Sequence, residues 1–376
     1  MVLSFKKMKS ILRAGLVLLV LLSLGEARSH ADETAPVVVG YFPSWTCPLP
    51  IGKINFGQFT HLIHAFATIK NGAIHTEGNL PSRELTSAGH AAGIKVLLGL
   101  GGEDSGAELS AMARNPATEA ACVQGLAKLV ADNGYDGIDV DWEFPTSADT
   151  ANAVAFVSQL RQALRQSNPD ALVTMPLPWT NYDGQSFDGP KLANLIDLAF
   201  IMTYDAHGPW KVDSHNYCHA GFDAPLNETA TDSVDGTVYS FPKAVDYWRG
   251  KGFKDSQLVV GIHSSGHGFL VDKWGETPLQ PSTHGDIEYR RIQGLLDAGW
   301  QRQWDDQAGV PWLRSPPALP PELITYDDPQ SVALKGKWAH NTGLRGIFFW
   351  EISEDYVGGH NVLVEAARKG FGLSEP

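Results

Sequence analysis

Three acidic residues at alternate positions are the feature of this sequence most able to do chemistry. They are Asp139, Asp141 and Glu143, and the positions between them hold Val140 and Trp142. Side chains alternate along a β-strand, so the three acids share one face, with neighbours about 7 Å apart. The apolar row can pack against helices. The acidic row is therefore expected to point into the interior of the fold.

Burying three neighbouring carboxyl groups has a large free-energy cost. Desolvation and mutual repulsion both raise the pKa of such groups, so at least one should keep its proton near neutral pH. A carboxyl group of that kind can act as a general acid. Glu143 is the last of the three, so it should lie nearest the carboxyl ends of the strands, with Asp141 below it and Asp139 deeper.

Two other interpretations of the acidic row are an exposed acidic edge and a metal cage. The β-branched neighbours disfavour an exposed edge. A metal site would be expected to include histidine, and no ligand-spaced pair such as H-E-x-x-H occurs in the chain. The sequence therefore predicts a catalytic role for the row and no metal.

Eight short apolar runs must position these residues. They are Val37–Tyr41, Leu62–Phe66, Lys95–Leu100, Gly137–Asp141, Leu172–Pro176, Leu198–Thr203, Leu258–Ile262 and Gly346–Trp350. Each is bounded by Gly, Pro or polar residues, as buried parallel strands are. Helical periodicity separates most of them, most clearly in residues 120–133 and 151–166. The alternation predicts an α/β fold, a (β/α)8 TIM barrel with its site at the carboxyl ends of the strands.

The distance between the last two runs is too long for one loop and one helix. We expect an inserted subdomain there, between the seventh and eighth barrel strands, at about residues 267–323. Its small core would come from five aromatic residues, Trp274, Tyr289, Trp300, Trp304 and Trp312. An insertion at this place lies on the active face of a barrel, because the loops that follow the strands emerge there.

The composition limits the class of partner. The 376 residues include 29 basic and 42 acidic side chains, a net charge of −13, which argues against binding to nucleic acid or an anionic membrane. A hydrophobic content of 43% is enough for a large core. No P-loop, dinucleotide fingerprint or G-x-S-x-G motif occurs, so no cofactor is expected and serine hydrolase chemistry lacks support.

The first 31 residues have the pattern of a secretory signal peptide. Basic residues precede the apolar run 14–24, and Ser29-His30-Ala31 places small residues at positions −3 and −1. An uncleaved anchor is the alternative, although the run is short for a membrane span. The mature chain, residues 32–376, is expected to be secreted or periplasmic without stable membrane association. Export permits a Cys47–Cys218 disulfide; three free thiols are the alternative.

The acidic segment resembles the signature of a known enzyme family. Residues 136–143, D-G-I-D-V-D-W-E, match the D-G-x-D-x-D-x-E motif of glycoside hydrolase family 18, the chitinases and their relatives. Similar segments stand at 39–42, 202–205, 325–329 and 346–351, so the resemblance covers nearly the whole mature chain. It implies a barrel with an inserted α+β subdomain. It also implies a retaining mechanism in which the substrate's own acetamido oxygen is the nucleophile.

The resemblance implies catalytic roles for four residues. Glu143 would protonate the leaving oxygen and later activate water. Asp141 would hold the acetamido N–H and stabilise the cyclic intermediate, and Asp139 would tune Asp141. Tyr204 would donate its hydroxyl to the acetamido oxygen.

The resemblance also implies substrate-binding and supporting residues. The expected substrate contacts are Tyr41, Met202, Asp205, Trp350, Trp179 and Trp210, and the expected supporting residues are Asp136, Gly101 and Gly102. Trp45 and Trp142 also lie near strand ends, but Trp142 is expected to pack behind the strand because it shares the face of Val140.

Three departures from the family pattern concern the site. Gly99 replaces a serine that supports the deep aspartates, so the tuning of Asp139 is expected to differ. Ser264-Ser265-Gly266-His267 stands where relatives often carry a tyrosine and an arginine, so substrate contacts there should differ too. His64 stands where an aromatic residue is common, and a buried, hydrogen-bonded histidine is expected.

The acidic motif does not by itself identify the glycan. An endo-β-N-acetylglucosaminidase or a peptidoglycan-directed hydrolase would carry the same acids, because both need an N-acetyl group. A non-catalytic chitin-binding lectin usually lacks the acid, and Glu143 is present. The inserted subdomain favours a deep cleft for a chain. We therefore expect a monomeric chitinase that cleaves β-1,4 bonds between N-acetylglucosamine units of chitin or a related glycan.

Overall fold

The computed structural model describes residues 35–45, 49–211, 218–229 and 239–374. The predicted signal peptide and Cys47 lie outside the described residues, so the signal peptide and the Cys47–Cys218 pairing stay predictions. Cys122 is buried. The described residues from Val37 onward form one compact unit. Within the described ranges, no helix has both the length and the apolar character needed to cross a membrane.

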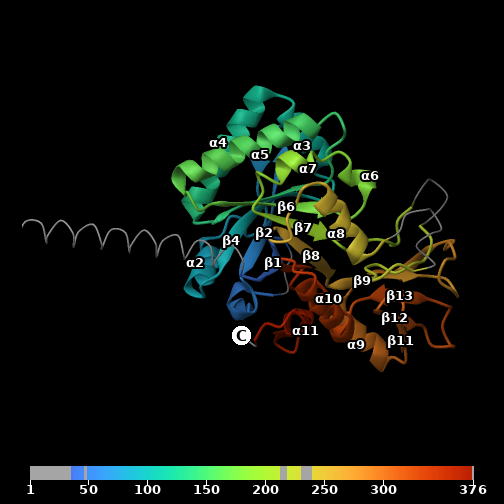
Figure 1. The fold of residues 1–376 in the computed structure, drawn as a ribbon. Helices are drawn as coiled ribbons and strands as arrows, with labels where there is room; N and C mark the ends of the chain where they lie inside the picture. The colour runs from blue at the N-terminus through green and yellow to red at the C-terminus, as the bar shows by residue number, and fades with distance from the viewer. Residues whose placement is uncertain (1–34, 46–48, 212–217, 230–238, 375–376) are drawn as a thin grey trace, which may run out of the picture. The chain divides into compact units, whose positions relative to one another are not determined.

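Eight parallel strands form a closed barrel, which confirms the predicted TIM barrel (Figure 1). They are β1 (Val37–Pro43), β2 (His61–Lys70), β4 (Lys95–Gly102), β5 (Gly137–Trp142), β6 (Leu172–Pro178), β7 (Leu198–Met202), β8 (Leu258–His263) and β14 (Gly346–Trp350). The neighbours run β1-β14-β8-β7-β6-β5-β4-β2, and pairing of β1 with β2 closes the ring. The short β3 (Ala73–His75) pairs with β2 as a hairpin.

The helices follow the strands around the barrel. They are α2 (Arg83–Ala91), α3 (Gly106–Ala113), α4 (Pro116–Asn133), α5 (Thr150–Ser167), α6 (Asn181–Gly184), α7 (Gly189–Leu192), α8 (Phe241–Gly250), α10 (Pro329–Asn341) and α11 (Val362–Gly370). The helices predicted at 120–133 and 151–166 lie within α4 and α5. The start and end of α4 are set locally. The Asn115 side chain accepts two backbone N–H groups at its start, and Gly134 ends it with a φ of 72°.

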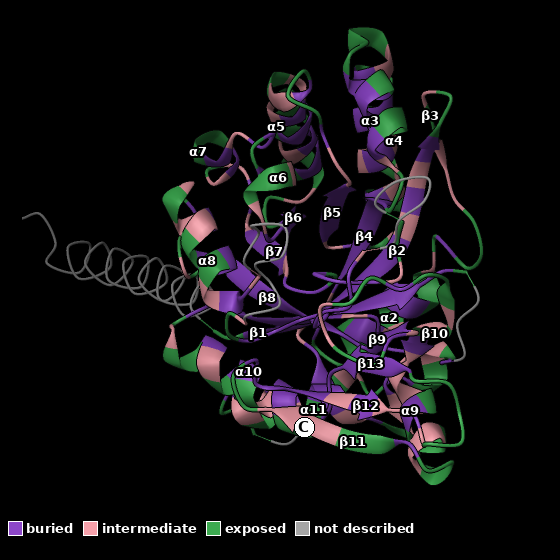
Figure 2. Cartoon of the chain, turned by 90° about the vertical axis from the view of Figure 1, so that its right-hand side faces the viewer, coloured by how far each residue is buried: buried purple, intermediate pink, exposed green. Residues whose placement is uncertain are grey.

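The apolar faces of the helices pack on the outside of the barrel. Val140 and Trp142 of β5 belong to the same core cluster as Leu126 of α4 and Phe156 of α5. Trp142 lies edge-on to Phe156, as its position in the strand predicts. Figure 2 shows the barrel strands almost wholly buried and the outer sides of the helices exposed. The opposite face of β5 therefore points into the barrel interior.

A second, antiparallel sheet lies in the chain between β8 and β14. Its strands are β9 (Ser265–Phe269), β10 (Pro281–Glu288), β11 (Gln301–Asp305), β12 (Val310–Arg314) and β13 (Leu323–Tyr326), and α9 (Tyr289–Asp297) follows β10. They are ordered β10-β9-β13-β12-β11. Four of the five predicted aromatic residues join its small core clusters, namely Trp274, Tyr289, Trp300 and Trp312. Because β9 begins directly after β8, this sheet starts at the carboxyl ends of the barrel strands.

Candidate active site

The acidic face of β5 points into the barrel, as the alternation predicts. Asp139 is fully buried and Asp141 is 4% exposed. The Tyr41 hydroxyl of β1 donates to Asp139 Oδ2 at 2.8 Å, and the Thr174 hydroxyl of β6 donates to Asp139 Oδ1 at 2.6 Å. Glu143 follows the strand and is partly exposed. The three acids therefore run from the buried interior to the carboxyl end of the barrel.

Tyr41 and Thr174 provide hydroxyl support for the deepest aspartate. Burial raises the pKa of Asp139 to about 7, although both hydroxyl donors lower it. A Cβ atom at Gly99 would lie 2.7 Å from Cδ1 of Phe66, so this ring occupies the space of the absent serine. Thr174 was not predicted from the sequence. In the sequence, Thr174 stands out only as a single hydroxyl residue within an apolar strand. The pairing of Asp139 with Thr174 between β5 and β6 is what makes it a partner of Asp139.

Asp141 and Glu143 share a hydrogen bond between their side chains, and such a bond requires a proton. Burial, then the charges of Glu143 and Asp139, raise the pKa of Asp141 well above its usual range. Burial, followed by the charges of Asp205 and Glu103, raises the pKa of Glu143 to about 7. The pair therefore holds a proton near neutral pH.

One oxygen of this pair is left available. Among the described residues, the buried Asp141 Oδ1 has no hydrogen-bond partner. An unpaired buried acceptor costs free energy, and native structures keep few of them without a reason. A ligand N–H group would satisfy this oxygen.

Backbone contacts hold Asp141 and Glu143 in place. The Ser105 hydroxyl donates to the Asp141 carbonyl at 3.1 Å and accepts the Glu143 N–H at 3.3 Å. Gly101 pairs with Asp141 across the strands and has a φ of 111°, and a Cβ atom there would lie 1.8 Å from the Asp141 carbonyl oxygen. Gly102, with a φ of 93°, is the next residue. The two predicted supporting glycines thus permit close approach of β4 to β5, and Ser105 was not predicted.

Tyr204 lies just after β7 and faces the same acids. It is 6% exposed, and burial, then the charges of Asp205, Glu143 and Asp141, raise its pKa well above 10. Its hydroxyl therefore keeps its proton and can donate. The His263 ring packs against it at an interplanar angle of 30°, with centroids 5.3 Å apart. Met202 is partly buried in the same interior cluster.

Aromatic side chains form one wall beside the acids. Trp350 stacks on Phe66 with centroids 5.6 Å apart and lies edge-on to Tyr41. Trp45 continues this wall, 6.3 Å from Phe66 and 6.4 Å from Trp350, and is 52% exposed. Trp45 was not among the predicted substrate contacts.

The two tryptophans that were selected differ in exposure. Trp210 is 41% exposed and lies against His267, with ring centroids 5.2 Å apart. Trp179 is buried against Tyr239. Trp210 therefore has a free ring surface, whereas little of Trp179 is accessible. Both sugar contacts stay predictions.

Asp136 lies at the amino end of β5, away from Glu143. Its Oδ2 accepts the Val96 N–H at 2.7 Å and lies 2.8 Å from His90 Nε2. It therefore ties β4 to β5 and supports the strand from its far end. The other histidine considered, His64, is buried between Tyr135 and Asn79, as expected.

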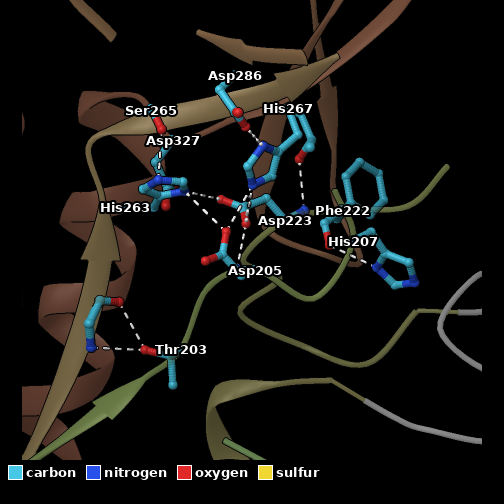
Figure 3. A network of polar contacts seen from close by, with 12 residues as sticks. Thr203, Asp205, His207, Phe222, Asp223, His263, Ser265, His267, Asp286 and Asp327 are labelled. Carbon is cyan, nitrogen blue, oxygen red and sulfur yellow. Dashed lines mark hydrogen bonds and ion pairs between the residues drawn. The ribbon is translucent and has the colours of Figure 1, made fainter. Parts of the chain in front are cut away.

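A polar cluster surrounds Asp205 (Figure 3). Asp205, with a φ of 60°, donates its N–H to Asp223 Oδ1 at 2.6 Å. His267 Nε2 lies 2.9 Å from Asp205 Oδ1, and His263 Nδ1 lies 3.1 Å from Asp223 Oδ2. Burial opposes the charge of Asp223, but the two histidines hold its pKa at about 2. Of these residues, only Asp205 was predicted to belong to the site.

The chain is similar to known proteins over most of its length. The sequence model of Glycosyl hydrolases family 18 matches residues 37–355. A chitinase-like effector of Moniliophthora roreri is 26% identical over 95% of this chain and 98% of its own. An endochitinase of Manduca sexta is 25% identical over 95% of this chain and 71% of its own. A Group IV chitinase of Ostrinia furnacalis, crystallised with allosamidin, aligns with a TM-score of 0.80 and 25% identity over 90% of this chain and 100% of that one.

Proposed function

Because this chain belongs to glycosyl hydrolase family 18 and is a glycoside hydrolase, we propose that it is a secreted chitinase. Its substrate would be the β-1,4 bond between N-acetylglucosamine units. The observation that carries the proposal is the proton-sharing pair Asp141–Glu143 in the barrel, beside the buried hydroxyl of Tyr204. The solved chitinase that resembles this chain holds allosamidin, and the Manduca sexta relative is named an endochitinase, which supports the substrate class.

The first step of the proposed mechanism breaks the glycosidic bond. Glu143 gives its proton to the leaving oxygen while the acetamido oxygen of the same sugar attacks C1, so that a cyclic oxazolinium ion forms. Asp141 Oδ1 accepts the acetamido N–H, and its carboxylate stabilises the positive charge that develops. Tyr204 donates to the acetamido oxygen and fixes its direction of attack.

The second step returns the enzyme to its starting state. Water attacks C1 of the cyclic ion from the side that the leaving group vacated, and Glu143 accepts the proton of this water. The ring opens with retention of configuration. Asp139 accepts hydrogen bonds from Tyr41 and Thr174 and lies next to Asp141. As the proton of Glu143 moves, the negative charge is redistributed between Asp139 and Asp141.

The predicted signal peptide over residues 1–31 supports the proposed secretion. The segment combines basic residues, an apolar run and small residues at the cleavage positions. Secretion suits an enzyme whose substrate is an extracellular polymer. A monomer is proposed for the mature chain, residues 32–376.

The proposal is tested by a substrate panel and an intermediate mimic. We expect turnover of chitin and chito-oligosaccharides to exceed turnover of glycoprotein and peptidoglycan by at least about tenfold in kcat/KM. A chitobiose-derived thiazoline, which resembles the cyclic intermediate, should inhibit competitively and bind at least about a hundredfold more tightly than chitobiose. A preference for glycoprotein or peptidoglycan would contradict the proposed substrate. A lack of inhibition by the thiazoline would contradict the proposed mechanism.

The pH dependence of the reaction follows from the shared proton. Burial and nearby carboxylates raise the pKa of Glu143 to about 7, so the acid form persists below that pH and is lost above it. We expect kcat/KM on chito-oligosaccharides to fall about tenfold per pH unit on the alkaline side. Aryl glycosides, whose leaving groups need little protonation, should show a shallower fall. A flat alkaline profile with oligosaccharides would contradict the assignment of Glu143 as the acid.

A further inference from the structure

Figure 3 shows four side chains that converge on one point. They are Asp205 after β7, Asp223 in the following loop, His263 at the end of β8 and His267 in β9, and one ligand atom from each lies within 4.8 Å of the others. The closest approaches of imidazole nitrogens to carboxylate oxygens are 2.9, 3.1, 3.6 and 3.8 Å. Tetrahedral coordination with bonds of about 2.0–2.1 Å separates ligand atoms by about 3.3 Å, so this spacing suits one ion.

The second nitrogen of each imidazole is held by an outer partner. His267 Nδ1 lies 2.9 Å from Asp286 Oδ1, and His263 Nε2 lies 2.6 Å from the Ser265 hydroxyl. Metal-binding histidines show this arrangement, because the outer carboxylate or hydroxyl fixes the tautomer and directs the other nitrogen at the ion. Each histidine therefore presents one nitrogen to the shared point, with its ring orientation already set.

We infer that Asp205, Asp223, His263 and His267 form a binding site for one divalent transition-metal ion of the zinc class. Two imidazoles and two carboxylates select such an ion over Ca²⁺ or Mg²⁺, which prefer oxygen ligands. Metal binding would release the extra proton of each imidazole, and the two carboxylates and two neutral imidazoles would then carry a charge of −2, which one dication balances.

The burial of three of these side chains and the exposure of the fourth also suit a bound ion. Asp223, His263 and His267 are buried, at 1%, 6% and 3% exposure, whereas the Asp205 side chain is 45% exposed and gives the ion an entry path. The His263 ring packs on Tyr204. An ion here would join β7, β8 and β9 directly behind Tyr204 and hold Asp205 at the open side of the site. Its role is structural, so it adds no step to the proposed hydrolysis.

The test is metal binding by the tag-free mature protein after treatment with a chelator and removal of that chelator. Titration with ZnCl2 in a calorimeter should show one equivalent of zinc bound, and the melting temperature should rise with zinc. CoCl2 should give the intense visible absorption bands of tetrahedral Co²⁺. The cobalt spectrum needs no variant, so the test does not depend on the folding of one.

Substitutions of the proposed ligands test whether zinc binds at this cluster. His267→Arg keeps a positive partner for Asp205 but cannot bind the metal, and it should weaken zinc binding by about a hundredfold or more. Asp223→Asn should do the same. His284→Gln is the matched control, because His284 contacts Glu322 in the second sheet and should leave zinc affinity unchanged.

Two results would overturn the inference. One is the absence of tetrahedral cobalt bands in the unaltered protein. The other is an unchanged zinc affinity in both His267→Arg and Asp223→Asn. Either would mean that the cluster holds two imidazolium–carboxylate ion pairs without a metal. Because binding is measured without a sugar, both results leave the proposed hydrolysis untouched.

Discussion

Glu143→Gln is expected to reduce kcat on soluble chito-oligosaccharides by about 10⁴-fold, the upper range for loss of a general acid and base. Glutamine has nearly the same shape but can neither give nor take the proton in the two steps. The loss is large because one carboxyl group serves both steps. Initial rates by product chromatography and oligosaccharide binding by calorimetry measure the effect, and the dissociation constant should change less than about threefold.

Glu103→Gln is the matched control for this substitution. Glu103 is exposed, and its charge acts on Glu143 only from a distance. Its kcat should stay within about threefold of the unaltered protein, with a small acid shift of the alkaline limb, because removing a nearby negative charge lowers the pKa of Glu143. Turnover close to that of the unaltered protein in Glu143→Gln would reject Glu143 as the acid.

Asp141→Asn is expected to lower kcat by about 10³-fold. The substitution keeps the size of the side chain but removes the negative charge next to the oxazolinium ion, and it disrupts the shared proton of Glu143. The affinity for the thiazoline should fall more than the affinity for the substrate, since the mimic depends on contacts made in the transition state. Rates and inhibition constants measured on the same preparation give both quantities.

The folded state of this variant is expected to be at least as stable as that of the unaltered protein. Burial, Glu143 and Asp139 all disfavour a charge at Asp141, so the removal of that charge relieves repulsion. Asp104→Asn is the control for the general effect of an Asp-to-Asn substitution, because it changes an exposed residue in the loop after β4. A rate loss below about tenfold, together with unchanged thiazoline affinity, would contradict charge stabilisation by Asp141.

Much of the fold and the orientation of the acids could be predicted from the sequence. Each of the eight predicted apolar runs overlaps a barrel strand, and α4 and α5 contain the two clearest predicted helices. The face that Asp139, Asp141 and Glu143 share follows from the two-residue repeat of a strand. These features are local, so they can be read over five to twenty neighbouring residues.

The partners of those residues were decided by the tertiary structure. The donors to Asp139 come from β1, 98 residues away, and from β6, 35 residues away. Phe66 occupies the space beside Gly99, and Trp45 rather than Trp179 extends the aromatic wall. Asp205 meets His267 across 62 residues of sequence, and Asp223 meets His263 across 40. Periodicity determines which face a side chain occupies, but only the order and register of the closed barrel determine which faces meet.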